Sequence, residues 1–148
     1  MNADTRQLIG DLLHRHNIMT LATVRPDGYP QATTVAYVND GLTIYIGIGD
    51  DSQKLRNIRL CDKVSLTIDR DEPDWRRIQG LSMAATAAQV TDPVEIAHIG
   101  DLMVAKFPQL QHLPKADLEG LALLRITPRV ISVLDYTKGF GHTEQVEV

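Results

Sequence analysis

Three alternating runs joined by short turns constrain the fold of this chain most strongly. The runs are "IMTLATV" (18–24), "QATTVAYV" (31–38) and "LTIYIGI" (42–48), and the turns between them are "RPDGYP" and "NDG". Alternation of apolar and polar residues is typical of strands with one buried face, and Pro, Asp, Asn and Gly favour tight turns. Because tight turns connect antiparallel neighbours, the sequence predicts a series of hairpins.

Further strand patterns bring the expected count to about six. "KVSLTID" (63–69) alternates again, an extended segment runs through Val90, and "LALLRITPRVISVLDY" (121–136) is interrupted at Pro128. Six short strands with few covering helices would leave exposed edges unless the sheet closes. We therefore expect a mainly β protein with some α-helix, in which an antiparallel sheet of six strands forms a small barrel with flanking helices.

Three helices are expected around this barrel. The first follows Asp4 as a plausible cap, and the second covers residues 52–60. The third has Asp92 as its cap, Pro93 in its first turn and Glu95 placed to complete a capping box. A chain of 148 residues with 43% hydrophobic residues has the size of one domain, so we expect a single domain over residues 1–148.

Composition excludes several classes of protein. Fifteen Lys and Arg against nineteen Asp and Glu give a net charge of −4, which argues against a nucleic-acid binder that relies on phosphate neutralisation. The single Cys61 permits no internal disulfide and no thiolate metal cage, and His14 and His16 point to different sides of a helix. We therefore expect no metal site.

The expected location is the cytoplasm. The N-terminus lacks the basic start and continuous apolar run of a signal peptide, and no stretch of 18 uninterrupted apolar residues occurs. A single cysteine also fits a reducing compartment. The sequence thus predicts an intracellular protein without a membrane partner.

The stretch "GDDSQK" (49–54) joins the third strand to the second helix. Backbone N–H groups and the positive end of the helix dipole meet at such a start, and Lys54 adds a cation, so a phosphate would be favoured there. In the simpler interpretation, Ser52 only caps a short helix whose cations are solvated. Asp50 and Asp51 oppose an anion unless they point outward.

Neighbouring strands add candidate contacts for a cofactor. Thr33 and Thr34 lie on the second strand, and Gly47 on the third offers a position without a side chain where a flat ligand could approach the backbone. Thr in a strand is usually only a good β-former. The combination is more informative than any single residue.

The runs "LATVRPDGYPQATTVAYV" and "LTIYIGIGDDSQKLRNIRLCDKVSLTI" resemble the pyridoxamine 5'-phosphate oxidase-like family of flavin-binding split barrels. The resemblance extends from Ile18 to roughly Asp92. It includes the R-P-D-G-x-P turn, the S-R-K-like helix start and the N-x-R-x-x-x-x-V-S-L step into the fourth strand. It implies a homodimer of six-stranded antiparallel split β-barrels with FMN at the interface.

The resemblance also implies a set of cofactor-binding residues. These are Thr33 and Thr34 near the phosphate and ring, Ser52, Gln53 and Lys54 at the phosphate-binding step, Asn57 one helical turn later, and Gln79 contributed by the partner chain. Residues of a chain end are usually disordered. The resemblance suggests instead that the tail folds over the flavin, with Phe140 stacking on it and His142 making a polar contact.

Two departures from the family pattern reduce the positive charge around the phosphate. The oxidases carry an Arg and a Lys where this chain has Thr33 and Val38, and an Arg where it has Gln53. FMN binding is therefore expected to be weaker. Oxidation of pyridoxamine phosphate itself is not expected, because the substrate-binding Arg of the oxidases has no counterpart after Tyr136.

The leading hypothesis is an FMN-dependent oxidoreductase acting on an unidentified small molecule. The flavin ring supplies the chemistry, so no catalytic side chain is predicted. One alternative is a module that binds or senses flavin or haem without turnover. Another is a reductase that uses the deazaflavin coenzyme, whose longer tail Arg56 and Arg59 could contact.

Overall fold

The computed structural model describes the backbone of residues 1–148 and every side chain except that of Lys115. The elements, in chain order, are α1 (Ala3–Arg15), β1 (Ile18–Val24), β2 (Pro30–Ala36), β3 (Val38–Asp40), β4 (Thr43–Gly49), α2 (Gln53–Leu60), β5 (Lys63–Ile68), η1 (Trp75–Arg77), β6 (Gln79–Gln89), α3 (Pro93–Lys106), η2 (Pro108–His112), α4 (Lys115–Glu119), β7 (Leu121–Asp135), η3 (Tyr136–Lys138) and β8 (Thr143–Glu147).

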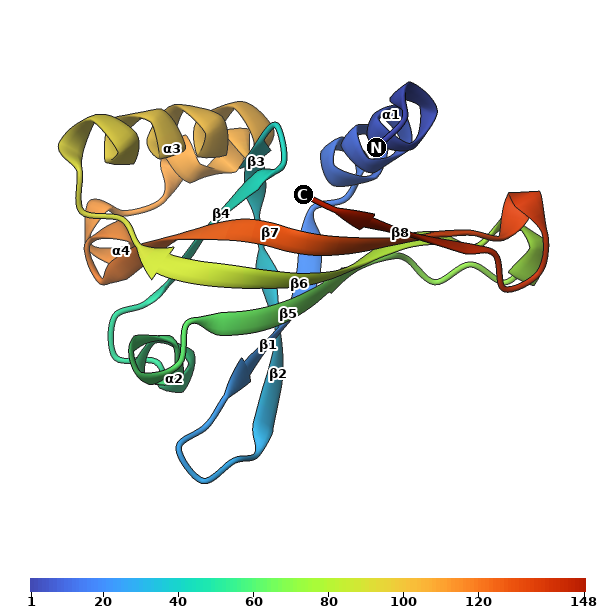
Figure 1. Cartoon of the computed structure of the whole chain (residues 1–148). Coiled ribbons are helices and arrows are strands. Elements are labelled where there is room, and N and C mark those ends of the chain that lie inside the picture. The colour runs from blue at the N-terminus through green and yellow to red at the C-terminus, as the bar shows by residue number, and fades with distance from the viewer.

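The strands form one curled antiparallel sheet in the order β2-β1-β5-β6-β7-β4-β3, with β8 paired to β7 (Figure 1). The long strands β6 and β7 extend beyond the rest of the sheet into an arm that carries η1 and η3. The expected mainly β, antiparallel split barrel with flanking helices is confirmed. The structure has eight strands rather than six, because the second expected strand is divided and the tail forms β8.

Tyr37 divides the second expected strand into β2 and β3. Its side chain is buried, and its hydroxyl donates to Leu13 O over 2.7 Å at the end of α1. Since this side chain points into the core next to α1, the chain leaves β1, and β3 pairs with β4 instead. Burial raises the pKa of the Tyr37 hydroxyl.

The main core lies inside the curl of the sheet. Ile44 and Ile46 of β4 and Leu124 and Ile126 of β7 are fully buried there, and α1 and α2 close the core with Ile9, Leu12, Leu13, Leu55 and Ile58. A smaller cluster of Val38, Tyr45, Val90 and Ile99 lies between the sheet and α3. Burial of these apolar side chains is the principal force that holds the curl.

The N-terminal helix begins earlier than expected. Asn2 is the cap, and its side chain accepts from Thr5 N over 2.8 Å, so the predicted cap Asp4 lies inside the first turn. Asn2 is the cap because its side-chain oxygen lies within hydrogen-bonding distance of a free N–H group in the first turn. The predicted cap Ser52 is confirmed at the start of α2.

The start of α3 is partly as expected. Asp92 caps the helix by accepting from Val94 N over 3.2 Å, and Pro93 follows. The capping box predicted for Glu95 is wrong. Instead, the two carboxylate oxygens of Glu95 lie 2.6 and 2.8 Å from Arg125 Nη1, and Tyr45 Oη donates to the same carboxylate over 3.2 Å. A guanidinium is a stronger partner for a carboxylate than a neutral N–H group.

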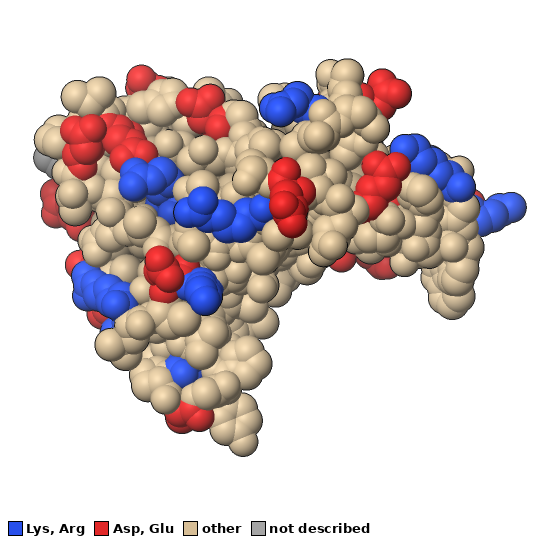
Figure 2. All heavy atoms as spheres, in the orientation of Figure 1, with Lys and Arg blue, Asp and Glu red and all other residues tan. Residues whose placement is uncertain are grey.

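Two rows of small uncharged residues cross β1, β5, β6 and β7 on one face of the sheet. Strand pairing aligns Thr20, Thr67, Ser82 and Ser132 in one row and Ala22, Ser65, Ala84 and Val130 in the next. Most of these residues are exposed, and we call the eight of them the open sheet face. On the side of the molecule shown in Figure 2, Lys and Arg are mixed with Asp and Glu in small groups. Among the described helices, none is long and apolar enough to cross a membrane.

Candidate functional site

The connection from β4 to α2, residues 49–54, is the first part of the candidate site, and we call it the seam. Ser52 N donates to Gly49 O over 3.1 Å, and Ser52 Oγ accepts from Leu55 N over 3.4 Å. Within the described structure, the N–H groups of Gln53 and Lys54 make no hydrogen bond. Such donors at the first turn of a helix, with the helix dipole behind them, can hold an anion.

A buried polar cluster fastens α2 to the first hairpin. Asn57 is 0% exposed, and its Nδ2 donates to Thr23 Oγ1 over 3.0 Å and to Gln31 Oε1 over 3.2 Å. Its Oδ1 accepts from Gln53 Nε2 over 2.8 Å. Because all polar atoms of Asn57 are engaged with protein groups, this residue positions the seam. Its predicted contact with a cofactor stays a prediction.

Thr33 and Thr34 point to opposite faces of β2. Thr33 shares the less exposed face with Gln31, and its hydroxyl oxygen is buried without a hydrogen-bond partner among the described residues. Thr34 is exposed and pairs with Thr20 on the other face. A buried hydroxyl without a partner is costly, so Thr33 Oγ1 offers a donor and an acceptor to a polar group on the face of β2 that carries Gln31.

The cations near the seam have different roles. Arg56 donates to Asp51 O over 2.6 Å and to Gln53 Oε1 over 3.0 Å, which braces the turn. Lys54 is half-buried and makes no hydrogen bond or ion pair within the described part of the chain. Asp50 and Asp51 have exposed side chains, as an anion site at this turn requires. Lys54 is therefore the cation best placed to meet an anion at the seam.

Gly47 lies on a different face from the seam residues. A Cβ at this position would be 3.4 Å from Leu121 Cδ1, 3.5 Å from Leu123 Cδ2 and 3.7 Å from Met103 Cε. It therefore faces apolar side chains of β7 and α3. The three atoms nearest to this position belong neither to Thr33 nor to the seam.

The remaining predicted residues lie on the arm, at the opposite end of the sheet from α2 (Figure 1). Phe140 is 75% exposed, and its ring centroid lies 5.6 Å from that of Tyr136 and 6.2 Å from that of Trp75. The tail that carries it is ordered into η3 and β8. The three rings form an aromatic cluster at the tip of the arm.

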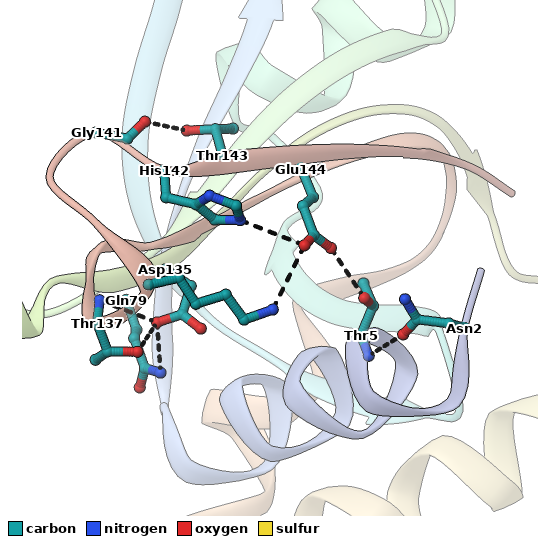
Figure 3. A network of polar contacts seen from close by, with 10 residues as sticks. Asn2, Thr5, Gln79, Asp135, Thr137, Gly141, His142, Thr143 and Glu144 are labelled. Carbon is teal, nitrogen blue, oxygen red and sulfur yellow. Dashed lines mark hydrogen bonds and ion pairs between the residues drawn. The ribbon is translucent and has the colours of Figure 1, made fainter.

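Gln79 and His142 belong to a polar network at the base of the arm (Figure 3). Gln79 Nε2 donates to Asp135 Oδ1 over 3.1 Å, and Thr137 Oγ1 donates to the same oxygen over 2.6 Å. Burial raises the pKa of the Asp135 carboxyl, but these hydrogen bonds favour the charged form more strongly, so its pKa is lowered overall. Gln79 is thus held by Asp135.

Glu144 is the second centre of this network. It accepts from Thr5 Oγ1 over 3.0 Å, lies 3.3 Å from His142 Nε2, and is 3.4 Å from Lys138 Nζ. The hydrogen bond from Thr5 is the largest of the contributions that lower the pKa of Glu144. A cavity of about 290 Å³ lies between these residues and α1. Sequence reasoning missed the network because Thr5 and Glu144 are 139 positions apart.

A comparison with protein-family models decides the family. The model described as "Pyridoxamine 5'-phosphate oxidase" matches residues 6–135 of the chain. The chain belongs to the pyridoxamine 5'-phosphate oxidase-like split-barrel family. The family resemblance of the first hairpins and the seam is thereby confirmed, and the match extends through β7.

Solved structures share the split-barrel architecture described above. A haem-binding protein from Mycobacterium smegmatis matches with a TM-score of 0.81 and 17% identity over 99% of this chain, which spans 59% of that protein. A structure described as a putative pyridoxamine 5'-phosphate oxidase from Listeria innocua matches with a TM-score of 0.72 and 22% identity, covering 88% of this chain and 98% of that one.

The haem-storage protein HutZ from Vibrio cholerae is a further structural neighbour. It matches with a TM-score of 0.69 and 21% identity over 82% of this chain and 87% of that one. At these identities the similarity shows the shared fold alone. Members of this fold therefore include proteins named for haem and proteins named for the oxidase, and the choice between them depends on the site.

Proposed function

We propose that this protein binds FMN as a cytoplasmic homodimer and acts as an oxidoreductase on a small molecule that is yet to be identified. The observation that carries the proposal is the buried Thr33 hydroxyl without a partner. It lies on the same face of β2 as Gln31, which accepts a hydrogen bond from Asn57 of α2. A phosphate bound against this face of β2 would give that hydroxyl an acceptor. The family assignment makes a flavin the leading candidate.

The phosphate would be held mainly by backbone groups. The N–H groups of Gln53 and Lys54 point from the first turn of α2, and Lys54 supplies a positive charge. Gln53 and Asn57 would keep this turn against β1 and β2 through their side-chain hydrogen bonds. Since neutral residues stand where the oxidases have cations, the site is expected to bind FMN less tightly than they do.

When bound, FMN supplies hydride or single-electron transfer, and the protein has to orient the ring and exclude water. Phe140 is the best candidate for a contact with the ring, because it is the most exposed member of the aromatic cluster on the arm, at 75% against 63% for Trp75. His142 and Gln79 are already oriented by Glu144 and Asp135. They can therefore present a polar group without first losing conformational freedom.

A dimer would bring the two halves of the site together. Within one chain, α2 and the arm lie at opposite ends of the sheet (Figure 1), so Phe140 and the seam are far apart. Family members are typically dimeric. The open sheet face offers small, uncharged side chains through which a second copy could pack closely. The arm of the partner would then reach the seam.

Binding without turnover is the second candidate. The neighbours named for haem binding and haem storage support it at the level of the fold, and His142 lies beside the 290 Å³ cavity as a potential axial ligand. The deazaflavin alternative has less support, because Arg56 is engaged with Asp51 and Gln53, and Arg59 with Gln89.

The absorption spectrum of the purified protein tests the proposal. Full-length protein is reconstituted with FMN, with haem and with deazaflavin coenzyme in parallel, and binding is followed by absorbance and fluorescence. FMN binding with bleaching of the flavin band by NADH or NADPH under anaerobic conditions would support an oxidoreductase. A Soret band with no affinity for FMN would overturn the flavin proposal, and FMN binding without reduction by either donor would leave a binding module.

A further inference from the structure

A second cavity, of about 360 Å³, lies between α3 and the start of β7. Its lining is almost entirely apolar and includes Val90, Ile96, Met103, Leu118, Leu121 and Leu123. The volume falls within the range of small-molecule pockets, which are mostly apolar with few polar groups. None of its lining residues belongs to the seam or to the buried polar cluster around Asn57.

Gly100 keeps part of this cavity open. It lies within α3 and lines the cavity, and a Cβ at this position would meet nothing within 4 Å. Packing inside the protein therefore does not require glycine here. Because Gly100 lines the cavity and has open space beside it, a larger side chain at this position would enter the cavity.

One polar side chain at this cavity, that of Gln89, accepts a hydrogen bond from a cation. Gln89 lines the cavity at the end of β6, and its Oε1 accepts from Arg59 Nη2 over 3.2 Å. Arg59 is exposed and lies on α2. The cavity thus combines an apolar interior with an amide and a guanidinium at one edge. This arrangement matches a molecule with an apolar body and one anionic end.

We propose that this cavity binds an apolar monocarboxylate, such as a medium-chain fatty acid. The hydrocarbon chain would lie between α3 and β7 against Met103 and Leu123, and the carboxylate would meet Arg59 and the amide of Gln89. Burial of the chain provides most of the free energy of binding. Arg59 selects the charge of the head group.

The cavity adjoins the seam without sharing a residue with it. Asp50 N donates to Gly120 O over 2.9 Å, directly before Leu121 of the cavity wall, and Gly47 packs against Leu121 and Leu123. A molecule bound in the cavity would therefore affect the position of the turn before α2. The proposal does not depend on flavin binding, and each can fail without the other.

Titration of the full-length protein with octanoate tests the proposal, with acetate and octylamine as contrasting probes. Calorimetry is expected to show saturable one-to-one binding of octanoate, weaker binding of octylamine and none of acetate. Gly100→Leu should weaken octanoate binding by about tenfold or more, because its side chain fills the cavity. Gly10→Leu is the matched control, since Gly10 is also helical and a Cβ there also meets nothing within 4 Å.

Two further measurements keep the test independent of any one variant. With ¹³C-methyl methionine, octanoate should shift the methyl signal of Met103 and leave those of Met19 and Met83, which are buried in the main core. Arg59→Gln should reduce the preference for octanoate over octanol by about two- to fivefold, as for an exposed charge pair. Non-saturable uptake, an unshifted Met103 signal, or equal affinity in Gly100→Leu and Gly10→Leu would overturn the proposal.

Discussion

Asn57 on α2 donates from Nδ2 to Thr23 Oγ1 on β1 over 3.0 Å, and neither side chain reaches solvent, with exposures of 0% and 2%. This contact joins residues 34 positions apart and sets where the first turn of α2 lies relative to the β1–β2 hairpin. The geometry of the seam therefore depends on a neutral buried amide. A change at Asn57 should affect stability first and cofactor binding through it.

Asn57→Ala should lower the free energy of unfolding by about 2–3 kcal/mol, because it removes three hydrogen bonds and leaves buried partners unsatisfied. Urea unfolding followed by circular dichroism measures the change. Asn17→Ala is the control, since Asn17 is exposed and its side chain makes no hydrogen bond in the described structure, and it should change the value by less than about 0.5 kcal/mol. Equal effects of the two variants would contradict this role.

Lys54→Ala should weaken FMN binding by about 1.5–3 kcal/mol, the range for a hydrogen bond to a charged group. Quenching of flavin fluorescence gives the dissociation constant. Arg6→Ala removes a cation from the exposed face of α1 and should leave the constant unchanged. An unchanged constant in Lys54→Ala would remove this residue from the proposed site.

A mixture of two defective variants should recover cofactor binding if each site combines two chains. Lys54→Ala impairs the seam and Phe140→Ala impairs the arm, so a mixed dimer contains one site with both parts intact. After random subunit exchange, about one quarter of all sites should bind FMN with the affinity of the unmodified protein. Titration of the mixture against each variant alone measures this fraction. No recovery after verified exchange would place seam and arm in separate sites.

The Asp135 network should make stability depend on pH on the acid side. The pKa of Asp135 in the folded protein lies below its ordinary value of 3.8, so its contribution is present at higher pH and is lost as pH falls through the folded pKa. The stability difference between the unmodified protein and Asp135→Asn should be constant above about pH 5 and shrink below about pH 4. Unfolding curves from pH 7 to pH 3 measure it, and a pH-independent difference would contradict the assignment.

Local sequence patterns determined much of the fold. Turn residues between alternating runs predict the hairpins, and Ser52 and Asp92 mark the starts of α2 and α3 correctly, because a cap involves groups only two or three residues apart. Strand alternation also separates Thr33 from Thr34. The family resemblance pointed to the seam, and the family match confirmed the family without testing the individual site residues.

Tertiary structure alone decided which distant groups meet. Glu95 pairs with Arg125, which is 30 positions away, instead of completing the expected capping box. Gly47 faces Met103 and Leu121 rather than the seam. Thr5 donates a hydrogen bond to Glu144, which is 139 positions away. The amino-acid sequence by itself determined the strands, turns and helix starts, since these depend on neighbours within a few residues. The polar clusters and cavities depend on the curl of the sheet and on which helices pack against it, and that curl results from burial of the whole core.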